Sequence, residues 1–107
     1  MLSQLLEIYS ELWVRPDSPW AAHESGSLER MRSFLASSPE VFLRSHGPGR
    51  LTGSALVCDP QLSRVALTHH RKLGKWLQFG GHADGDENLA RVALREAEEE
   101  SGLPRLR

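Results

Sequence analysis

The chain has 107 residues, enough for one domain or for a small domain with an appendage. Its 39% hydrophobic content and net charge of -1 indicate a globular chain and exclude bulk electrostatic attraction to nucleic acid or acidic membranes. No apolar run approaches the roughly 20 residues that span a bilayer, and the acidic N-terminal stretch is unlike a signal peptide. A single cysteine, Cys58, excludes an internal disulfide and is interpreted as a small buried residue at a strand end. The expected location is cytoplasmic.

Residues 1–47 are expected to form a helical region. A stripe of apolar residues at spacings of three and four predicts a first helix, which Pro16 ends. The stripe consists of Leu2, Leu5, Leu6, Tyr9, Leu12 and Trp13. A second helix is expected over residues 28–35, with Ser27 as its N-cap. The Ser-Pro-Glu sequence at residues 38–40 predicts the start of one more short helix.

A change of pattern marks the boundary to a second region, residues 48–107. The break falls at a Gly-Pro-Gly sequence, which is typical of a turn or linker. Beyond it the apolar residues no longer follow a helical period, and β-strand signals replace them. Extended segments are expected at residues 51–58, 64–68 and 76–79, with turns at 59–61 and 73–75.

The best-signalled element is a helix over residues 89–101. This segment is rich in Ala, Leu, Arg and Glu, which are strong helix formers. Asn88 can cap its start, Gly102 suits its C-terminal end, and Pro104 prevents continuation.

Acidic side chains fall on the apolar side of this helix. The apolar face consists of Leu89, Val92, Ala93 and Ala97. Glu96 and Glu100 lie in the middle of that face and Glu99 at its edge, whereas Glu98 points to the opposite side. Like charges this close are destabilising unless a cation compensates them. Mg²⁺ or Mn²⁺, which prefer oxygen ligands, is the expected compensator; a solvated acidic helix end is the alternative.

The loop before the helix adds to this pattern. Gly80 and Gly81 allow close approach of the backbone, so that a carbonyl can turn toward the same ion. Glu87 and Arg95 are opposite charges on either side of the helix start, and Arg95 is the natural cation to hold Glu87 or to steady the cluster of glutamates.

The spacing of these residues resembles the Nudix box at every fixed position. The matching residues, in order, are Gly81, Glu87, Arg95, Glu96, Ala97, Glu99, Glu100, Gly102 and Leu103. Five residues separate Gly81 from Glu87, and seven separate Glu87 from Arg95. The one soft departure is Ala97, where the family usually has a larger aliphatic residue. The resemblance covers residues 51–103 and leaves the helical region outside it.

The resemblance implies an α/β fold, namely a Nudix α/β/α sandwich with a mixed sheet, preceded here by the helical region. It implies hydrolysis of a nucleoside diphosphate linked to another group. The implied ligands of Mg²⁺ or Mn²⁺ are the Gly81 carbonyl and the carboxylates of Glu96, Glu99 and Glu100. Glu99 or Glu96 is implied to accept the proton of the attacking water. The pair of Glu87 and Arg95 is implied to be a structural ion pair.

Basic residues precede the box and are candidates for contact with a substrate phosphate. They are Arg71, Lys72 and Lys75, for which solvated surface positions are the alternative. His82 lies inside the box loop and is the histidine expected nearest the site. The expected partner is a small nucleotide substrate, with no nucleic acid polymer and no membrane.

The chain stops at Arg107, soon after the box, whereas a Nudix domain ordinarily continues with further strands. We therefore expect either a fragment of a longer protein or a second copy of the chain that completes the sheet. Three rival functions stand beside hydrolysis. The first is a non-catalytic Nudix-like module that binds a nucleotide for regulation. The second is a Nudix-fold isomerase, for which no nucleophile pattern is seen, and the third is a helical interaction protein built on residues 1–47.

Overall fold

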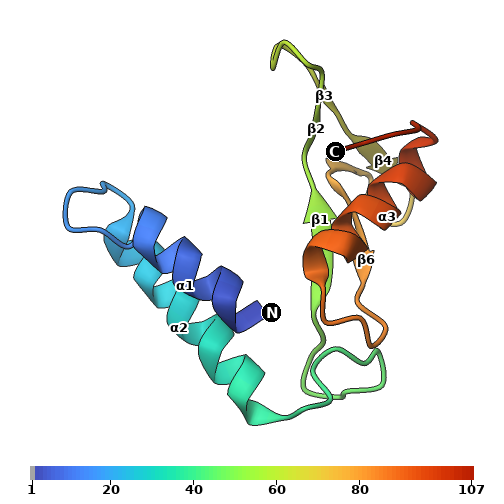
Figure 1. Cartoon of the computed structure of the whole chain (residues 1–107). Coiled ribbons are helices and arrows are strands. Elements are labelled where there is room, and N and C mark those ends of the chain that lie inside the picture. Colours follow the sequence, from blue (N-terminus) through green and yellow to red (C-terminus); the bar gives the residue numbers. More distant parts are fainter. Residues whose placement is uncertain (1) are drawn as a thin grey trace. The chain divides into compact units, whose positions relative to one another are not determined.

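The computed structural model describes residues 2–107, which divide into two compact units between Val41 and Phe42 (Figure 1). This division lies before the boundary expected after residue 47. The loop that follows Phe42 belongs to the second unit because it is bonded to that unit's own residues. The Gly85 N–H donates to the Phe42 carbonyl at 2.7 Å, and the Ala83 N–H donates to the Leu51 carbonyl at 3.1 Å.

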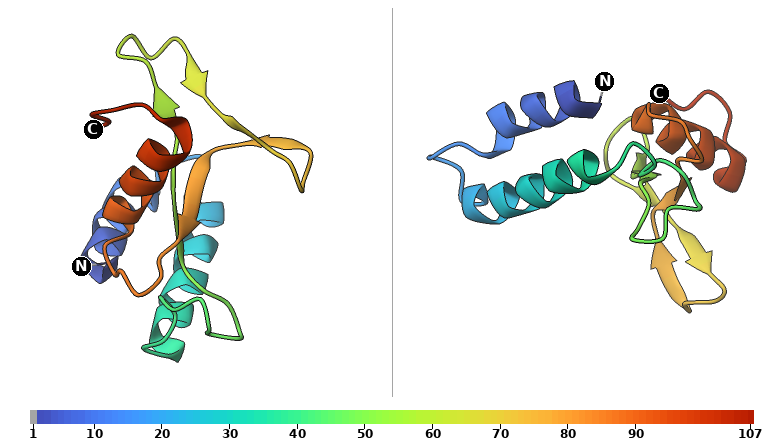
Figure 2. Two further views of the ribbon diagram at one scale, coloured as in Figure 1. Left: turned by 90° about the vertical axis from the view of Figure 1, so that its right-hand side faces the viewer. Right: turned by 90° about the horizontal axis from the view of Figure 1, so that it is seen from below.

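The first unit is a hairpin of two helices, α1 (Leu2–Trp13) and α2 (Ala21–Ser37). The two helices lie side by side and antiparallel (Figures 1 and 2). Polar contacts join them: the Tyr9 hydroxyl donates to the Glu24 carboxylate, and Arg32 pairs with Glu7. The predicted first helix is confirmed. No helix among residues 2–107 is long and apolar enough to cross a membrane.

Two predictions for this region were wrong. Ser27 does not cap a helix but lies inside α2, where its hydroxyl accepts a hydrogen bond from Arg30 Nη2 at 3.2 Å. The segment after α2 forms turns instead of a short helix. Ser38 is extended, with φ -165° and ψ 147°, and its hydroxyl accepts from the Glu40 N–H at 3.1 Å. This local bond gives the backbone an alternative to a helical turn.

The second unit contains three antiparallel strand pairs. They are β1 (Thr52–Ala55) with β6 (Phe79–His82), β2 (Val57–Cys58) with β3 (Val65–Ala66), and β4 (Thr68–His70) with β5 (Lys75–Leu77). Leu56, Leu67 and Gln78 each interrupt an extended segment at the point where it changes partner. The chain therefore mixes helices with strands, as expected. Every pairing in the described chain is antiparallel, so the parallel pairing of a mixed sheet is absent from residues 2–107.

Helix α3 (Leu89–Ser101) lies along β1 and β6 (Figure 2). Its buried residues close the apolar core of this unit. The buried apolar residues there are Leu51, Phe79, Ala83, Val92 and Ala97. Cys58 stands at the end of β2, as predicted, but it is exposed and not buried.

Candidate functional site

Helix α3, which carries the acidic residues, begins and ends where its predicted capping residues place its ends. The Asn88 side chain accepts a hydrogen bond from the Arg91 N–H at 3.1 Å, which satisfies one donor of the first turn. Gly102 adopts a left-handed conformation with φ 71°, and its N–H donates to the Glu98 carbonyl at 3.0 Å. Both predicted end signals are confirmed, so the register of the acidic residues on α3 is fixed locally.

A glycine in β1 sets the distance between α3 and the strands. A Cβ added at Gly53 would lie 2.7 Å from the Leu89 carbonyl oxygen and 2.9 Å from the Ala93 nitrogen. The backbones of β1 and α3 therefore approach more closely than any side chain at this position permits. Sequence reasoning did not single out Gly53; the available signal was a glycine inside a predicted strand, which often marks close approach of another backbone.

The same close packing brings together two residues of the predicted metal site. Gly81 in β6 pairs with Gly53 across the strands, and Glu96 projects from α3. A Cβ at Gly81 would lie 2.5 Å from Glu96 Cδ, and 2.6 and 2.8 Å from its two carboxylate oxygens. The Glu96 carboxylate thus occupies the space that any larger residue at position 81 would fill.

Glu100 lines a cleft of about 280 Å³ beside the same glycine. Its other walls include Gly80 and Gly81, the hydroxyl side chains of Thr52, Ser54 and Thr68, and the imidazoles of His70 and His82. His82, the histidine expected nearest the site, lines this cleft. Within the described chain, its buried Nδ1 has no hydrogen-bond partner. The residues that line the cleft beside Gly81 thus include hydroxyl, imidazole and carboxylate side chains.

Glu99 is not brought to this place. It is exposed on α3 and does not line the cleft that contains Gly81 and Glu100. Among residues 2–107, no group of three or more His, Cys, Asp or Glu side chains is arranged to hold a metal ion. The structure places Glu96 against Gly81 and Glu100 in the cleft that Gly81 also lines, which is less than the predicted set. Their donors are all oxygen, the type that Mg²⁺ and Mn²⁺ prefer.

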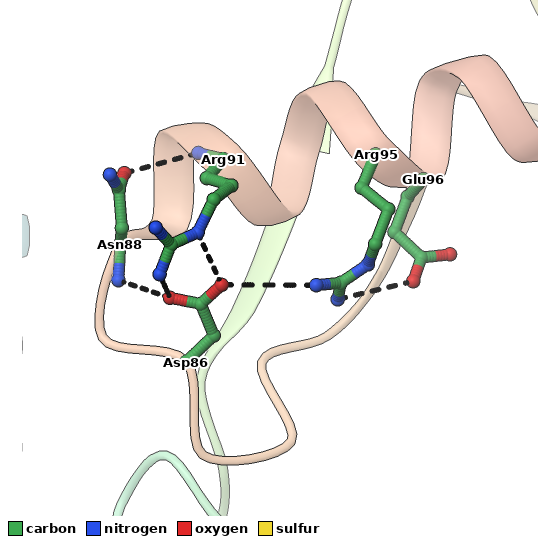
Figure 3. Close-up of polar contacts among 5 residues, drawn as sticks. All are labelled: Asp86, Asn88, Arg91, Arg95 and Glu96. Atoms are coloured by element: carbon green, nitrogen blue, oxygen red, sulfur yellow. Dashed lines mark hydrogen bonds and ion pairs between the residues drawn. The ribbon is translucent and has the colours of Figure 1, made fainter.

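The predicted ion pair between Arg95 and Glu87 is not formed, and Asp86 takes the place of Glu87 (Figure 3). Arg95 Nη1 lies 3.8 Å from Asp86 Oδ2, and Arg95 Nη2 lies 3.7 Å from Glu96 Oε1. Asp86 is held in the loop because it accepts a hydrogen bond from the Asn88 N–H at 2.9 Å, while Glu87 is exposed.

Asp86 also forms a two-point contact with Arg91 in the first turn of α3 (Figure 3). Arg91 Nε and Nη2 donate to its two carboxylate oxygens at 2.8 and 2.7 Å. The hydrogen bonds from Arg91 and from the Asn88 N–H lower the pKa of Asp86 to about 2. Asp86 is therefore the charge that joins the loop to two arginines of α3.

A second anchor fixes the tip of the same loop. Arg44 donates through Nε and Nη2 to the two carboxylate oxygens of Asp84 at 3.1 and 2.9 Å. This hydrogen-bonded pair lowers the pKa of Asp84 below its ordinary value. Asp84 and Gly85 both have positive φ, at 49° and 89°, so the loop turns sharply there. Sequence reasoning missed Arg44, because nothing local signals a partner so far along the chain.

The basic residues proposed to meet phosphate are not brought to the cleft. Arg71 and Lys72 lie in the turn between β4 and β5, Lys75 begins β5, and all three are exposed. None of them lines the cleft beside Gly81.

No protein-family model, no curated protein and no solved structure matches the chain. The resemblance of residues 81–103 to the Nudix box thus stays a prediction that rests on the residues themselves.

Proposed function

We propose that residues 42–107 carry the metal-binding loop and helix of a Nudix-type hydrolase with an α/β/α sandwich fold. Its reaction cleaves the diphosphate linkage of a nucleoside diphosphate joined to another group. The observation that carries the proposal is the contact between Glu96 and Gly81. These residues come from different elements, and the resemblance assigns both to one metal site.

The residues of this chain have separate roles in the proposed reaction. Glu96, Glu100 and the Gly81 carbonyl would hold Mg²⁺ or Mn²⁺ through oxygen donors: Glu96 lies against Gly81, and Glu100 lines the cleft that Gly81 also lines. When bound, the cation neutralises the diphosphate and activates water for attack at phosphorus. Glu96 or Glu99 would accept the proton of the attacking water: Glu96 lies between Gly81 and Arg95, and Glu99 is exposed three residues further along α3.

The test is a phosphate-release screen over nucleoside diphosphate derivatives with Mg²⁺ or Mn²⁺. Turnover should depend on the cation and should fall at least about 100-fold in Glu96→Gln and in Glu100→Gln, because even partners of metal ligands are worth 10- to 100-fold. Glu98→Gln is the matched control on the same helix. Its side chain does not line the cleft, so turnover should be unchanged within about twofold.

A purely regulatory module gives a different result in the same experiment. Such a module binds the nucleotide but releases no phosphate, so calorimetric binding without turnover would replace the hydrolase with a nucleotide sensor. Equal turnover in the wild-type chain and in both glutamine variants would reject the assignment of Glu96 and Glu100.

A further inference from the structure

Arg95 lies between two carboxylates, and each faces a different nitrogen of its guanidinium. Nη1 is 3.8 Å from Asp86 and Nη2 is 3.7 Å from Glu96 (Figure 3). The guanidinium is planar and rigid, so fixing one nitrogen also fixes the direction of the other. The side chains of Asp86 and Glu96 are 16% and 20% exposed, which limits screening of these charges by solvent.

We propose that Asp86 is a positioning residue, which holds the Glu96 carboxylate against Gly81 by way of Arg95. Asp86 can do this because the Asn88 N–H fixes its carboxylate within the loop; Arg91 adds a further contact from the helix, which the role does not require. Glu87 is exposed and lacks these bonds. The sequence pattern paired Arg95 with Glu87, one residue further along the chain.

The consequence is that Glu96 is ordered before any cation arrives. A carboxylate that already has one orientation loses less side-chain entropy when it becomes a ligand. The single orientation of the Glu96 side chain is a property of the metal-free chain. Only its effect on turnover rests on the function proposed above.

Asp86→Asn tests the proposal, since the amide keeps the shape and an acceptor for Asn88 and Arg91 but removes the charge that faces Arg95. In the metal-free protein, NMR couplings of Glu96 should change from those of one rotamer to those of several. The dissociation constant for Mn²⁺ should rise about 10- to 100-fold. The value of kcat should fall by a similar factor, whereas KM should change less than about threefold, because Asp86 does not line the cleft.

Two further variants separate positioning from simple anchoring of the loop. Arg91→Gln removes the shorter contacts of Asp86 but leaves the path through Arg95, so Glu96 should stay ordered. In an Arg95→Gln background, Asp86→Asn should weaken Mn²⁺ binding by less than about twofold more, because the two residues act through one contact.

Each outcome bears on a distinct claim. An ordered Glu96 with unchanged Mn²⁺ affinity in Asp86→Asn would overturn the positioning role, and so would equal damage in Arg91→Gln. If the wild-type chain releases no phosphate from any substrate, the hydrolase proposal fails. The NMR comparison of Glu96 then still decides whether Asp86 positions it.

Discussion

At the scale of single residues, a substitution at Gly81 should change metal binding without changing the stability of the fold. In Gly81→Ala the new Cβ would meet the Glu96 carboxyl group at 2.5 Å, and that group is the end of a flexible side chain. We expect Glu96 to swing away, so that the free energy of unfolding changes by less than about 1 kcal/mol. The affinity for Mn²⁺ should fall about 10- to 100-fold, measured by calorimetry beside urea denaturation.

Gly47→Ala is the control for this variant, because a Cβ at Gly47 meets no atom within 4 Å. It should leave both the unfolding free energy and the Mn²⁺ affinity as they are. Full Mn²⁺ affinity in Gly81→Ala would show that the Glu96 carboxylate does not need its place beside residue 81.

At the scale of elements, the equivalent substitution in β1 should have the opposite effect. The atoms that a Cβ at Gly53 would meet, 2.7 and 2.9 Å away, belong to the backbone of α3 and cannot rotate aside. Gly53→Ala must therefore displace the helix, and overpacking of this kind costs about 1–3 kcal/mol. Urea denaturation and faster hydrogen exchange of α3 amides measure the effect. A neutral result would mean that α3 packs less closely on β1 than described.

The elements that sequence reasoning predicted well carry their signals locally. Asn88 and Gly102 lie at the two ends of α3, and each satisfies backbone groups of the adjacent turn. The partner of Arg95 was predicted wrongly because spacing does not reveal which acid of the loop faces the helix. The positive φ of Asp84 and Gly85 turns the backbone there, and the Asn88 N–H then holds Asp86.

At the scale of the whole molecule, contacts between distant segments were the part that sequence could not supply. The two hairpin turns followed from local turn residues, but the pairing of β1 with β6 and the approach of α3 to Gly53 did not. In the candidate site, too, some residues could be predicted from local sequence and others depend on contacts between distant segments. Residue types and helix phase suggested Glu96 and Glu100, whereas the cleft wall from β4 and the Arg44–Asp84 anchor depend on tertiary structure.

Two aspartates, Asp59 and Asp86, are held by hydrogen bonds to residues nearby in the chain and should make its stability depend on pH. The Asp59 carboxylate accepts from the Ser63 hydroxyl and from the N–H groups of Ser63 and Arg64, which lowers its pKa from 3.8 to about 2. The pKa of Asp86 is lowered equally far, chiefly by Arg91. The unfolded chain therefore binds more protons than the folded chain between these values. The stabilisation is complete above pH 3.8 and is lost as pH falls through about 2.

Urea denaturation followed by circular dichroism, at about pH 6, 3 and 2, measures this loss. The double variant Asp59→Asn/Asp86→Asn lacks both titrating groups, so its unfolding free energy should fall less steeply over the same range than that of the wild-type chain. It should also begin lower at the highest pH, because a neutral amide accepts weaker hydrogen bonds from arginine than a carboxylate does. Parallel curves for the two proteins would show that the acid sensitivity arises from other carboxylates, and that neither Asp59 nor Asp86 is stabilised in its charged form by the fold.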